Sequence, residues 1–240
     1  DQERRVVGVV CAESFEPPNG VKPVNRVRCG KLCGKRVSTV QRARRIFEDL
    51  VCPHPFRTLG QSLWRAWHVA PGFLNRNIVP VEWGSLGRMA IRTELLRCTP
   101  IEEALGRYSL YEDVDLSFRL MRKGMLLGLR TAAVFHDQAP HTRADAWELG
   151  VIGILNFAFA VCRNSPPASL ARRQVKRYAW IKAQKYRQNR IRYHAALAAL
   201  KQIDGLLTAR ETDVLHVYRS LQHSLFSAAI KKATFTQDNE

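Results

Sequence analysis

Short apolar runs separated by polar turns dominate the first part of the chain. Residues 6–11 (VVGVVC) form an apolar run of the length expected for a buried strand, and residues 78–83 and 131–135 have the same character. A further short strand is predicted at 88–92, directly after the glycine-bearing turn at 84–87. This part of the chain is therefore expected to contain a sheet.

A helix is predicted to begin near Asp113. Apolar residues at Val114, Phe118 and Met121 follow the i, i+4, i+7 spacing that places side chains on one face of a helix. The basic residue and glycine at 123–124 are typical of a helix end. Strands mixed with a helix in this way predict an α/β architecture.

The second part of the chain has the pattern of helices. The apolar run at 149–162 is shorter than the roughly 20 residues that a bilayer-spanning helix needs. It is therefore predicted to be a buried helix, with a helix lying against a membrane surface as the alternative. One long helix is predicted over 169–202 and a last one over 209–231, with Gly205 between them.

This change of pattern predicts two structural parts. Thr142 and Asp145 have the spacing of a capping box that would start the first of these helices. The strand patterns all precede that box. We therefore expect a mixed α/β part over residues 1–143 and an α-helical extension over 144–240.

The charge of the chain points to an anionic partner. Of its 240 residues, 38 are Lys or Arg and 21 are Asp or Glu, which gives a formal net charge of +17. So basic a protein is expected to meet nucleic acid, an anionic membrane surface or phosphorylated substrates. Residues 151–204 hold eleven basic residues and one acidic residue, whereas 111–150 holds five basic and six acidic residues. The chemistry is therefore sought in 111–150.

The helix predicted over 169–202 interleaves basic and aromatic residues, and this pattern has three interpretations. It is a solvated helix face, or a surface that docks on anionic lipid with Trp and Tyr at the headgroups. The third interpretation is a nucleic-acid-binding module in which aromatic rings stack on bases. The basic residues concerned are Arg172, Arg173, Lys176, Arg177, Lys182, Lys185, Arg187, Arg190 and Arg192.

Three carboxylates stand within four residues, at Glu112, Asp113 and Asp115. One explanation is structural, because carboxylates are favoured in the first turn of a helix, where free N–H groups point outward. The other is catalysis, since the cluster follows a glycine-bearing turn and precedes a strand that ends at His136. The residues by themselves leave both explanations open.

The strings WGSLGRMAIRTELL, EALGRYSLYEDVDLSFRLMRKG and AAVFH together carry a family resemblance. A glycine-bearing loop precedes a short strand and an arginine, an acidic pair opens a helix, and a histidine follows a later strand. In this order the segment resembles the C-terminal half of a family 2 glycosyltransferase catalytic domain of the GT-A fold. The resemblance extends over about 1–143 and is specific over 83–136. The matching residues are Trp83, Gly84, Gly87, Arg92, Glu112, Asp113, Asp115, Leu116, Arg119, Gly124 and His136.

The resemblance implies a role for each acid of the cluster. Asp113 would be the general base that takes the proton of an acceptor hydroxyl as it attacks the sugar of a nucleotide-diphosphate donor, with inversion. Glu112 would hold the acceptor or orient Asp113. Asp115 would contact the substrate, or instead fix the helix start or a neighbouring arginine.

The other positions are assigned to substrate and metal. Trp83, Gly84, Arg92 and Arg143 would make substrate contacts, and His136 would be a metal ligand near the diphosphate or, alternatively, a structural strand-end histidine. The resemblance implies a divalent metal, Mg²⁺ or Mn²⁺, a nucleotide-sugar donor, and a saccharide or lipid-linked saccharide acceptor. The leaving diphosphate needs cations of this kind.

The chain departs from the family in one respect. Its single Asp-x-Asp sequence, at 113–115, lies inside the base motif and not after a buried strand, so the nucleotide-binding half is expected to be missing and this fragment to be inactive alone. The predicted function is a glycosyltransferase of polysaccharide or cell-wall biosynthesis, in the cytoplasm or peripherally at the inner membrane face. The alternative is a non-catalytic, basic nucleic-acid-binding protein.

Overall fold

The computed structural model describes residues 6–14, 54–56, 58–59, 78–106, 108–135 and 145–237. The chain divides into two compact units, and each is described by itself. The sheet unit takes in 1–53, 60–101 and 116–143, and the helical unit takes in 54–59, 102–115 and 144–240. Residues 54–59 and 102–115, which the sequence analysis places in the mixed part, thus belong to the helical unit.

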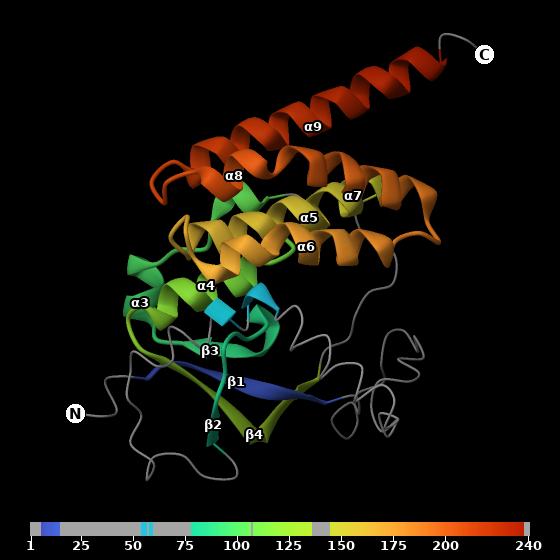
Figure 1. The fold of residues 1–240 in the computed structure, drawn as a ribbon. Helices are drawn as coiled ribbons and strands as arrows, with labels where there is room; N and C mark the ends of the chain where they lie inside the picture. The colour runs from blue at the N-terminus through green and yellow to red at the C-terminus, as the bar shows by residue number, and fades with distance from the viewer. Residues whose placement is uncertain are drawn as a thin grey trace, which may run out of the picture. The chain divides into compact units, whose positions relative to one another are not determined.

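The sheet unit contains a four-stranded sheet among its described residues (Figure 1). Its strands are β1 (Val6–Ser14), β2 (Ile78–Pro80), β3 (Met89–Ile91) and β4 (Met125–Phe135), in the order β2-β4-β1-β3. The central strands β1 and β4 are parallel, and each pairs with its outer neighbour in antiparallel fashion. A chain that contains both a mixed sheet and a helical part confirms the coarse α/β expectation.

The strand predictions hold in position but not in length. The strand predicted over 78–83 ends at Pro80 on the edge of the sheet, where proline's missing N–H costs no sheet hydrogen bond. The strand predicted over 131–135 is the end of the longer β4. Both central strands bury apolar side chains, and Gly8 in β1 allows close packing, since a Cβ there would lie 2.9 Å from the Ala90 carbonyl oxygen.

Helices α3 (Thr93–Cys98) and the second half of α4 (Glu112–Met121) lie on one face of this sheet (Figure 1). Val114, Phe118 and Met121, which carry the predicted helix periodicity, are all buried, and so are Leu116 and Leu120 beside them. Arg119 donates to the Pro100 carbonyl oxygen at 2.7 Å, which joins α4 to the chain after α3. The start predicted near Asp113 is confirmed to within one residue.

The helical unit is built around α5 (Ala146–Arg163). In Figure 1 this helix is surrounded by the remaining long helices of the unit. The prediction of one helix over 169–202 is wrong, because the Asn189 side chain accepts the Arg192 N–H and starts a new helix there. Gly205 lies inside a short helix and not between two helices. The helices are α6 (Leu170–Gln184), α7 (Arg190–Gln202), α8 (Asp204–Thr208) and α9 (Val214–Gln237).

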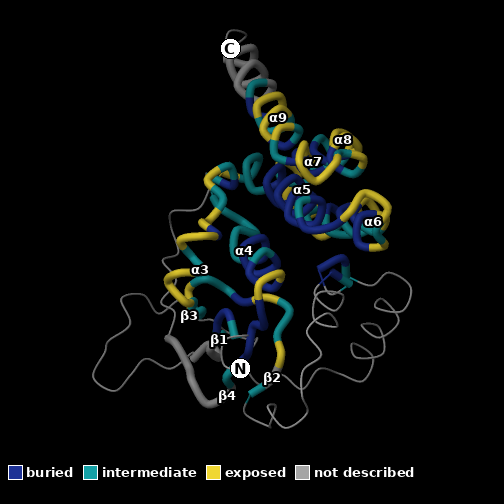
Figure 2. Tube along the Cα trace, turned by 90° about the vertical axis from the view of Figure 1, so that its left-hand side faces the viewer, coloured by how far each residue is buried: buried dark blue, intermediate teal, exposed yellow. Residues whose placement is uncertain are grey.

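Helix α5 is the core of the helical unit. Residues 150–162 are buried without interruption, and Figure 2 shows the helix in dark blue among its neighbours. Gly150 lets α7 approach closely, since a Cβ there would come within 2.4 Å of the Arg192 carbonyl oxygen. Helix α5 is long and apolar enough to cross a membrane by length and composition, but most of it is buried inside this unit. The buried-helix prediction is confirmed.

The start of α5 differs from the predicted capping box. Asp145, and not Thr142, is the N-cap, and its Oδ1 accepts the Glu148 N–H at 2.7 Å. An aspartate at this position satisfies an otherwise free donor of the first turn. Thr142 lies outside the described residues.

Arg172 joins the ends of two helices from a buried position. The sequence analysis counts it in a basic surface, yet its side chain is 1% exposed. Its Nε donates to the Ser165 carbonyl at 2.8 Å, and a terminal nitrogen donates to the Ala209 carbonyl at 2.6 Å. The other terminal nitrogen donates to the Cys162 carbonyl. The guanidinium therefore caps carbonyls that the ends of α5 and α8 leave unsatisfied, and burial lowers its pKa while arginine stays charged.

We expect Arg172→Met to destabilise the protein by about 3 kcal/mol, because several buried carbonyls lose a charged donor. Chemical denaturation with circular dichroism measures this change. Arg173→Met is the matched control, since Arg173 is exposed on the same helix, and it should change the free energy of unfolding by less than about 0.5 kcal/mol. Equal effects of the two substitutions would contradict the capping role.

Candidate functional site

The acidic cluster occupies the first turn of α4, as the sequence predicts. The residue before it, Tyr111, has a φ of 73°, which is a strained conformation for a bulky side chain. The Tyr111 ring packs edge-on against Phe56 and Phe157, with centroids 5.5 and 5.9 Å away. These contacts hold the backbone turn that determines where Glu112 and Asp113 begin the helix.

Glu112 and Asp113 stand in different surroundings although they are adjacent. Burial raises the pKa of Glu112, and the neighbouring Asp113 charge raises it further, against a hydrogen bond with Ser109 that lowers it. Asp113 is half-buried, and its Oδ1 accepts the Val114 N–H at 2.8 Å. Part of the Asp113 carboxylate therefore has the helix-capping role that the structural explanation predicts.

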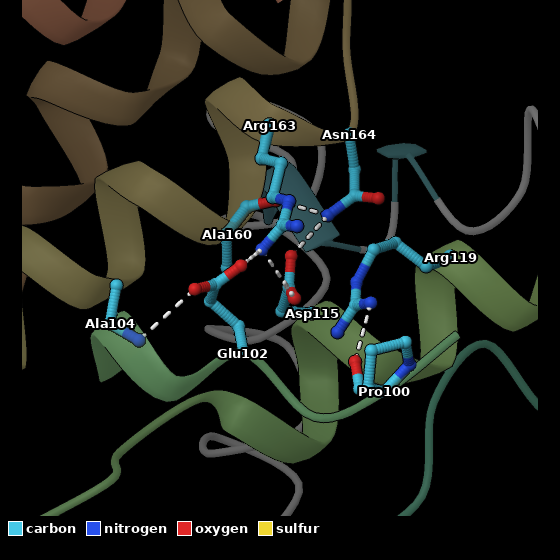
Figure 3. A network of polar contacts seen from close by, with 8 residues as sticks. All are labelled: Pro100, Glu102, Ala104, Asp115, Arg119, Ala160, Arg163 and Asn164. Carbon is cyan, nitrogen blue, oxygen red and sulfur yellow. Dashed lines mark hydrogen bonds and ion pairs between the residues drawn. The ribbon is translucent and has the colours of Figure 1, made fainter. Parts of the chain in front are cut away.

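Asp115 is fully buried and holds the helix start to α5 (Figure 3). Its Oδ1 accepts the Asn164 Nδ2 at 2.9 Å, and its Oδ2 lies 3.5 Å from the Arg163 terminal nitrogen. The same nitrogen binds Glu102. A buried carboxylate with these partners cannot meet substrate, so its assignment to substrate contact is corrected. Asp115 instead fixes a neighbouring arginine, the other role that the resemblance left open.

The polar residues of α5 converge on the segment 102–115. Asn156 Nδ2 donates to the Leu110 carbonyl at 3.0 Å, and the Asn156 Oδ1 accepts the Tyr218 hydroxyl at 2.7 Å. Asn156, Arg163 and Asn164 are thus three polar side chains from an otherwise apolar helix and its C-cap. All three bind the segment that carries the acids. Sequence reasoning missed this role, although Asn156 was visible as the one polar residue inside the run 149–162.

Trp83, Gly84 and Arg92 lie in the sheet unit. Gly84 is buried and donates its N–H to the Ser117 hydroxyl at 3.2 Å. A Cβ at Gly84 would lie 2.3 Å from a Val10 methyl, so close packing by itself requires glycine here. Trp83 is 42% exposed and Arg92 is exposed at the start of α3, where both can reach a ligand.

His136 and Arg143 lie outside the described residues, so their predicted roles as metal ligand and substrate contact stay predictions. Within the part of the chain that the structure describes, His, Cys, Asp and Glu side chains form no group of three that could hold a metal ion. Asp115 instead binds protein groups.

An unexpected feature of the helical unit is the environment of Lys182. Its Nζ lies 4.3 Å from the centroid of the Tyr111 ring and 5.9 Å from that of Phe157. The pKa of Lys182 is lowered to about 7, chiefly by burial and in addition by the positive charges of Arg192 and Lys185. The sequence analysis included Lys182 only as a surface charge, and no motif distinguishes it from its basic neighbours.

Comparisons of the chain with models of protein families, with curated proteins and with solved structures found no match. The family resemblance therefore rests on the residues of 83–136 alone.

We expect Asp115→Asn to destabilise the protein by about 1–3 kcal/mol, because it removes the charge that compensates Arg163 inside the helical unit. Asp113→Asn keeps the oxygen that accepts the Val114 N–H, and should change stability by less than about 1 kcal/mol. Urea denaturation of both variants tests the difference between the two carboxylates. A larger loss from Asp113→Asn than from Asp115→Asn would contradict these roles.

Replacing Lys182 should stabilise the fold below pH 7. The folded pKa of about 7 lies below the usual 10.5, so the unfolded chain binds more protons and wild-type stability rises between these pH values. Lys182→Met removes the buried charge and should add about 2 kcal/mol at pH 6, a gain that disappears by about pH 10. Thermal unfolding across this range measures it, and a gain that does not vary with pH would argue against a depressed pKa.

Proposed function

We propose that this chain is part of a family-2-like glycosyltransferase of the GT-A fold, with Asp113 as general base. One observation carries the proposal. The acidic pair of the motif lies in the first turn of a helix, behind a strained tyrosine and on a segment that α5 holds in place. Backbone strain of this kind concentrates at functional sites. The mixed sheet with two central parallel strands is compatible with the proposed fold.

The proposed reaction transfers a sugar from a nucleotide diphosphate to an acceptor hydroxyl. The hydroxyl oxygen forms the new bond to the anomeric carbon, the bond from that carbon to the diphosphate oxygen breaks, and the hydroxyl proton passes to Asp113. The raised pKa of Glu112 suits a side chain that hydrogen-bonds a sugar hydroxyl beside the proposed base. Trp83 and Arg92, both exposed, are the proposed substrate contacts in the sheet unit.

A divalent metal, which the family resemblance implies, would neutralise the charge of the leaving diphosphate. The proposal includes the metal in this role only. Among the described residues no three His, Cys, Asp and Glu side chains gather, and the proposed ligand His136 lies outside them. No step is therefore assigned to a metal here. The proposed acceptor is a saccharide or a lipid-linked saccharide, and the proposed place is the cytoplasm or the inner membrane face.

A second candidate function is supported by the exposed basic residues. Exposed basic residues lie on α6, on the turn that follows it and at the start of α7, namely Arg173, Arg177, Lys185, Arg187 and Arg190. Such a surface is suited to bind the phosphates of a nucleic acid without catalysis. This candidate predicts steeply salt-dependent binding to DNA or RNA that does not respond to changes at Asp113.

In the natural protein that contains this sequence, Asp113→Asn should lower sugar transfer by about 10²–10⁴-fold, because a general base contributes about this much to a rate. Release of nucleoside diphosphate from a panel of nucleotide sugars, with product mass, measures transfer. Glu103→Gln, an exposed acid of the same segment, is the charge-matched control and should keep wild-type activity. Full activity of the Asp113 variant would refute the assigned base, and salt-dependent nucleic-acid binding without transfer would favour the second candidate.

A further inference from the structure

We propose that the outer face of α6, which consists of Leu170, Arg173, Arg177 and Trp180, docks on an anionic membrane surface. The proposal names the partner and the surface for the membrane location, and for that location it rests on the proposed function. It concerns binding alone, so no donor or acceptor takes part in its test. It starts from the pattern of exposed residues along α6.

The outer face is a single stripe of the helix. Its residues follow one another at intervals of three, four and three positions, the spacing that keeps side chains on one side of an α-helix. All of them are exposed, and Figure 2 shows the exposed positions of α6 in yellow. The buried residues Val175, Ala179 and Ala183 occupy the other side, which packs inside the helical unit. The stripe is about 15 Å long, so a flat partner can contact all of it at once.

The outer face is positively charged, and its helix supplies no negative charge. No acidic residue occurs in α6, and none occurs in the sequence between Glu148 and Asp204. Asp204 itself binds Lys176, which lies at the edge of the face, at 2.9 Å. The turn that follows α6 adds the exposed Lys185 and Arg187. A surface of this composition attracts an anionic partner.

Large hydrophobic side chains are exposed among these cations. Leu170 is 55% exposed, Trp180 is 53% exposed, and Ile191 at the start of α7 is 59% exposed. Contact of this much apolar surface with water is unfavourable. A membrane interface suits the whole set, because tryptophan favours the headgroup level, aliphatic side chains enter the acyl chains below it, and arginine reaches back to the phosphates.

This mixture of side chains distinguishes a membrane from other partners. A nucleic acid offers phosphates to the arginines and bases to stack on Trp180, but it offers no apolar phase to Leu170 and Ile191. A second copy of the chain would bring like charges together, which is unfavourable. The anionic bilayer is the partner that accommodates both the charged and the aliphatic residues.

The first test measures co-sedimentation of the full chain with vesicles. One set contains phosphatidylcholine alone, and the other contains phosphatidylcholine and phosphatidylglycerol in equal parts. We expect tighter binding to the anionic set, weakened about fivefold by Arg173→Gln, because each basic residue near an anionic surface contributes about this factor. Arg219→Gln, an exposed arginine of α9, is the charge-matched control and should bind as wild type does. Equal binding to both sets, or an equal loss in the two variants, would overturn the proposal.

The apolar part of the face is tested separately. Leu170→Ser should weaken binding to the anionic vesicles by about three- to tenfold, because an aliphatic side chain no longer leaves water. Ile101→Ser is the control, since Ile101 is 42% exposed in the sheet unit, and it should have no effect. Binding of a single-stranded RNA that Arg173→Gln weakens, without any preference for anionic vesicles, would refute the membrane surface and favour the second candidate function.

A last measurement uses the wild-type chain and does not depend on how a variant folds. Hydroxyl radicals oxidise exposed tryptophans, and anionic vesicles should protect Trp180 but not Trp83 of the sheet unit in peptides quantified by mass spectrometry. Unchanged oxidation of Trp180, or equal protection of both residues, would contradict docking through α6. Asp113→Asn should bind the vesicles as wild type does, so failure of this proposal and failure of the proposed transfer reaction are separate results.

Discussion

The buried carboxylate of Asp115 is the interaction on which the candidate site depends. It accepts from Asn164 and faces Arg163, so the first turn of α4 is attached to the end of α5 by a charge that water does not reach. Burial of a carboxylate is costly unless it is paired and hydrogen-bonded, and both conditions are met here. Because Asp113 lies two residues earlier on the same turn, its position follows from this attachment.

The helical unit therefore does more than extend the chain beyond the sheet unit. Its core helix α5 is long and apolar enough to cross a membrane by length and composition. The polar side chains of Asn156, Arg163 and Asn164 nevertheless bind the segment 102–115. Arg172 in turn holds the end of α5 through backbone carbonyls. Helices 144–240 thus determine the local structure around the acids, which explains why the acids group with the helical unit and not with the sheet.

The spacing of apolar residues predicted the helices and strands whose pattern is local. It failed where a single polar side chain determines where an element begins or whether a residue is buried. The strand at 6–11 and the helix start near Asp113 follow from apolar spacing. The break at 185–189 was missed because the apolar spacing continues through it, whereas α6 ends at Gln184 and the Asn189 side chain caps the start of α7. Arg172 and Lys182 have the same sequence character as Arg173, and tertiary contacts alone separate a buried cap from an exposed charge.

Within the described part of the helical unit, buried side-chain atoms without a hydrogen-bond partner occur at Trp147, Asn164, Gln184 and Arg192. Tyr111 holds a strained backbone conformation, its ring faces Lys182, and Lys182 is repelled by Arg192, whose Nε lacks a partner. Each of these features costs stability, and a sequence under selection for stability alone would remove them. Tyr111 directly precedes the acids of α4 and its ring faces Lys182, so two of these costs meet at the turn that begins α4.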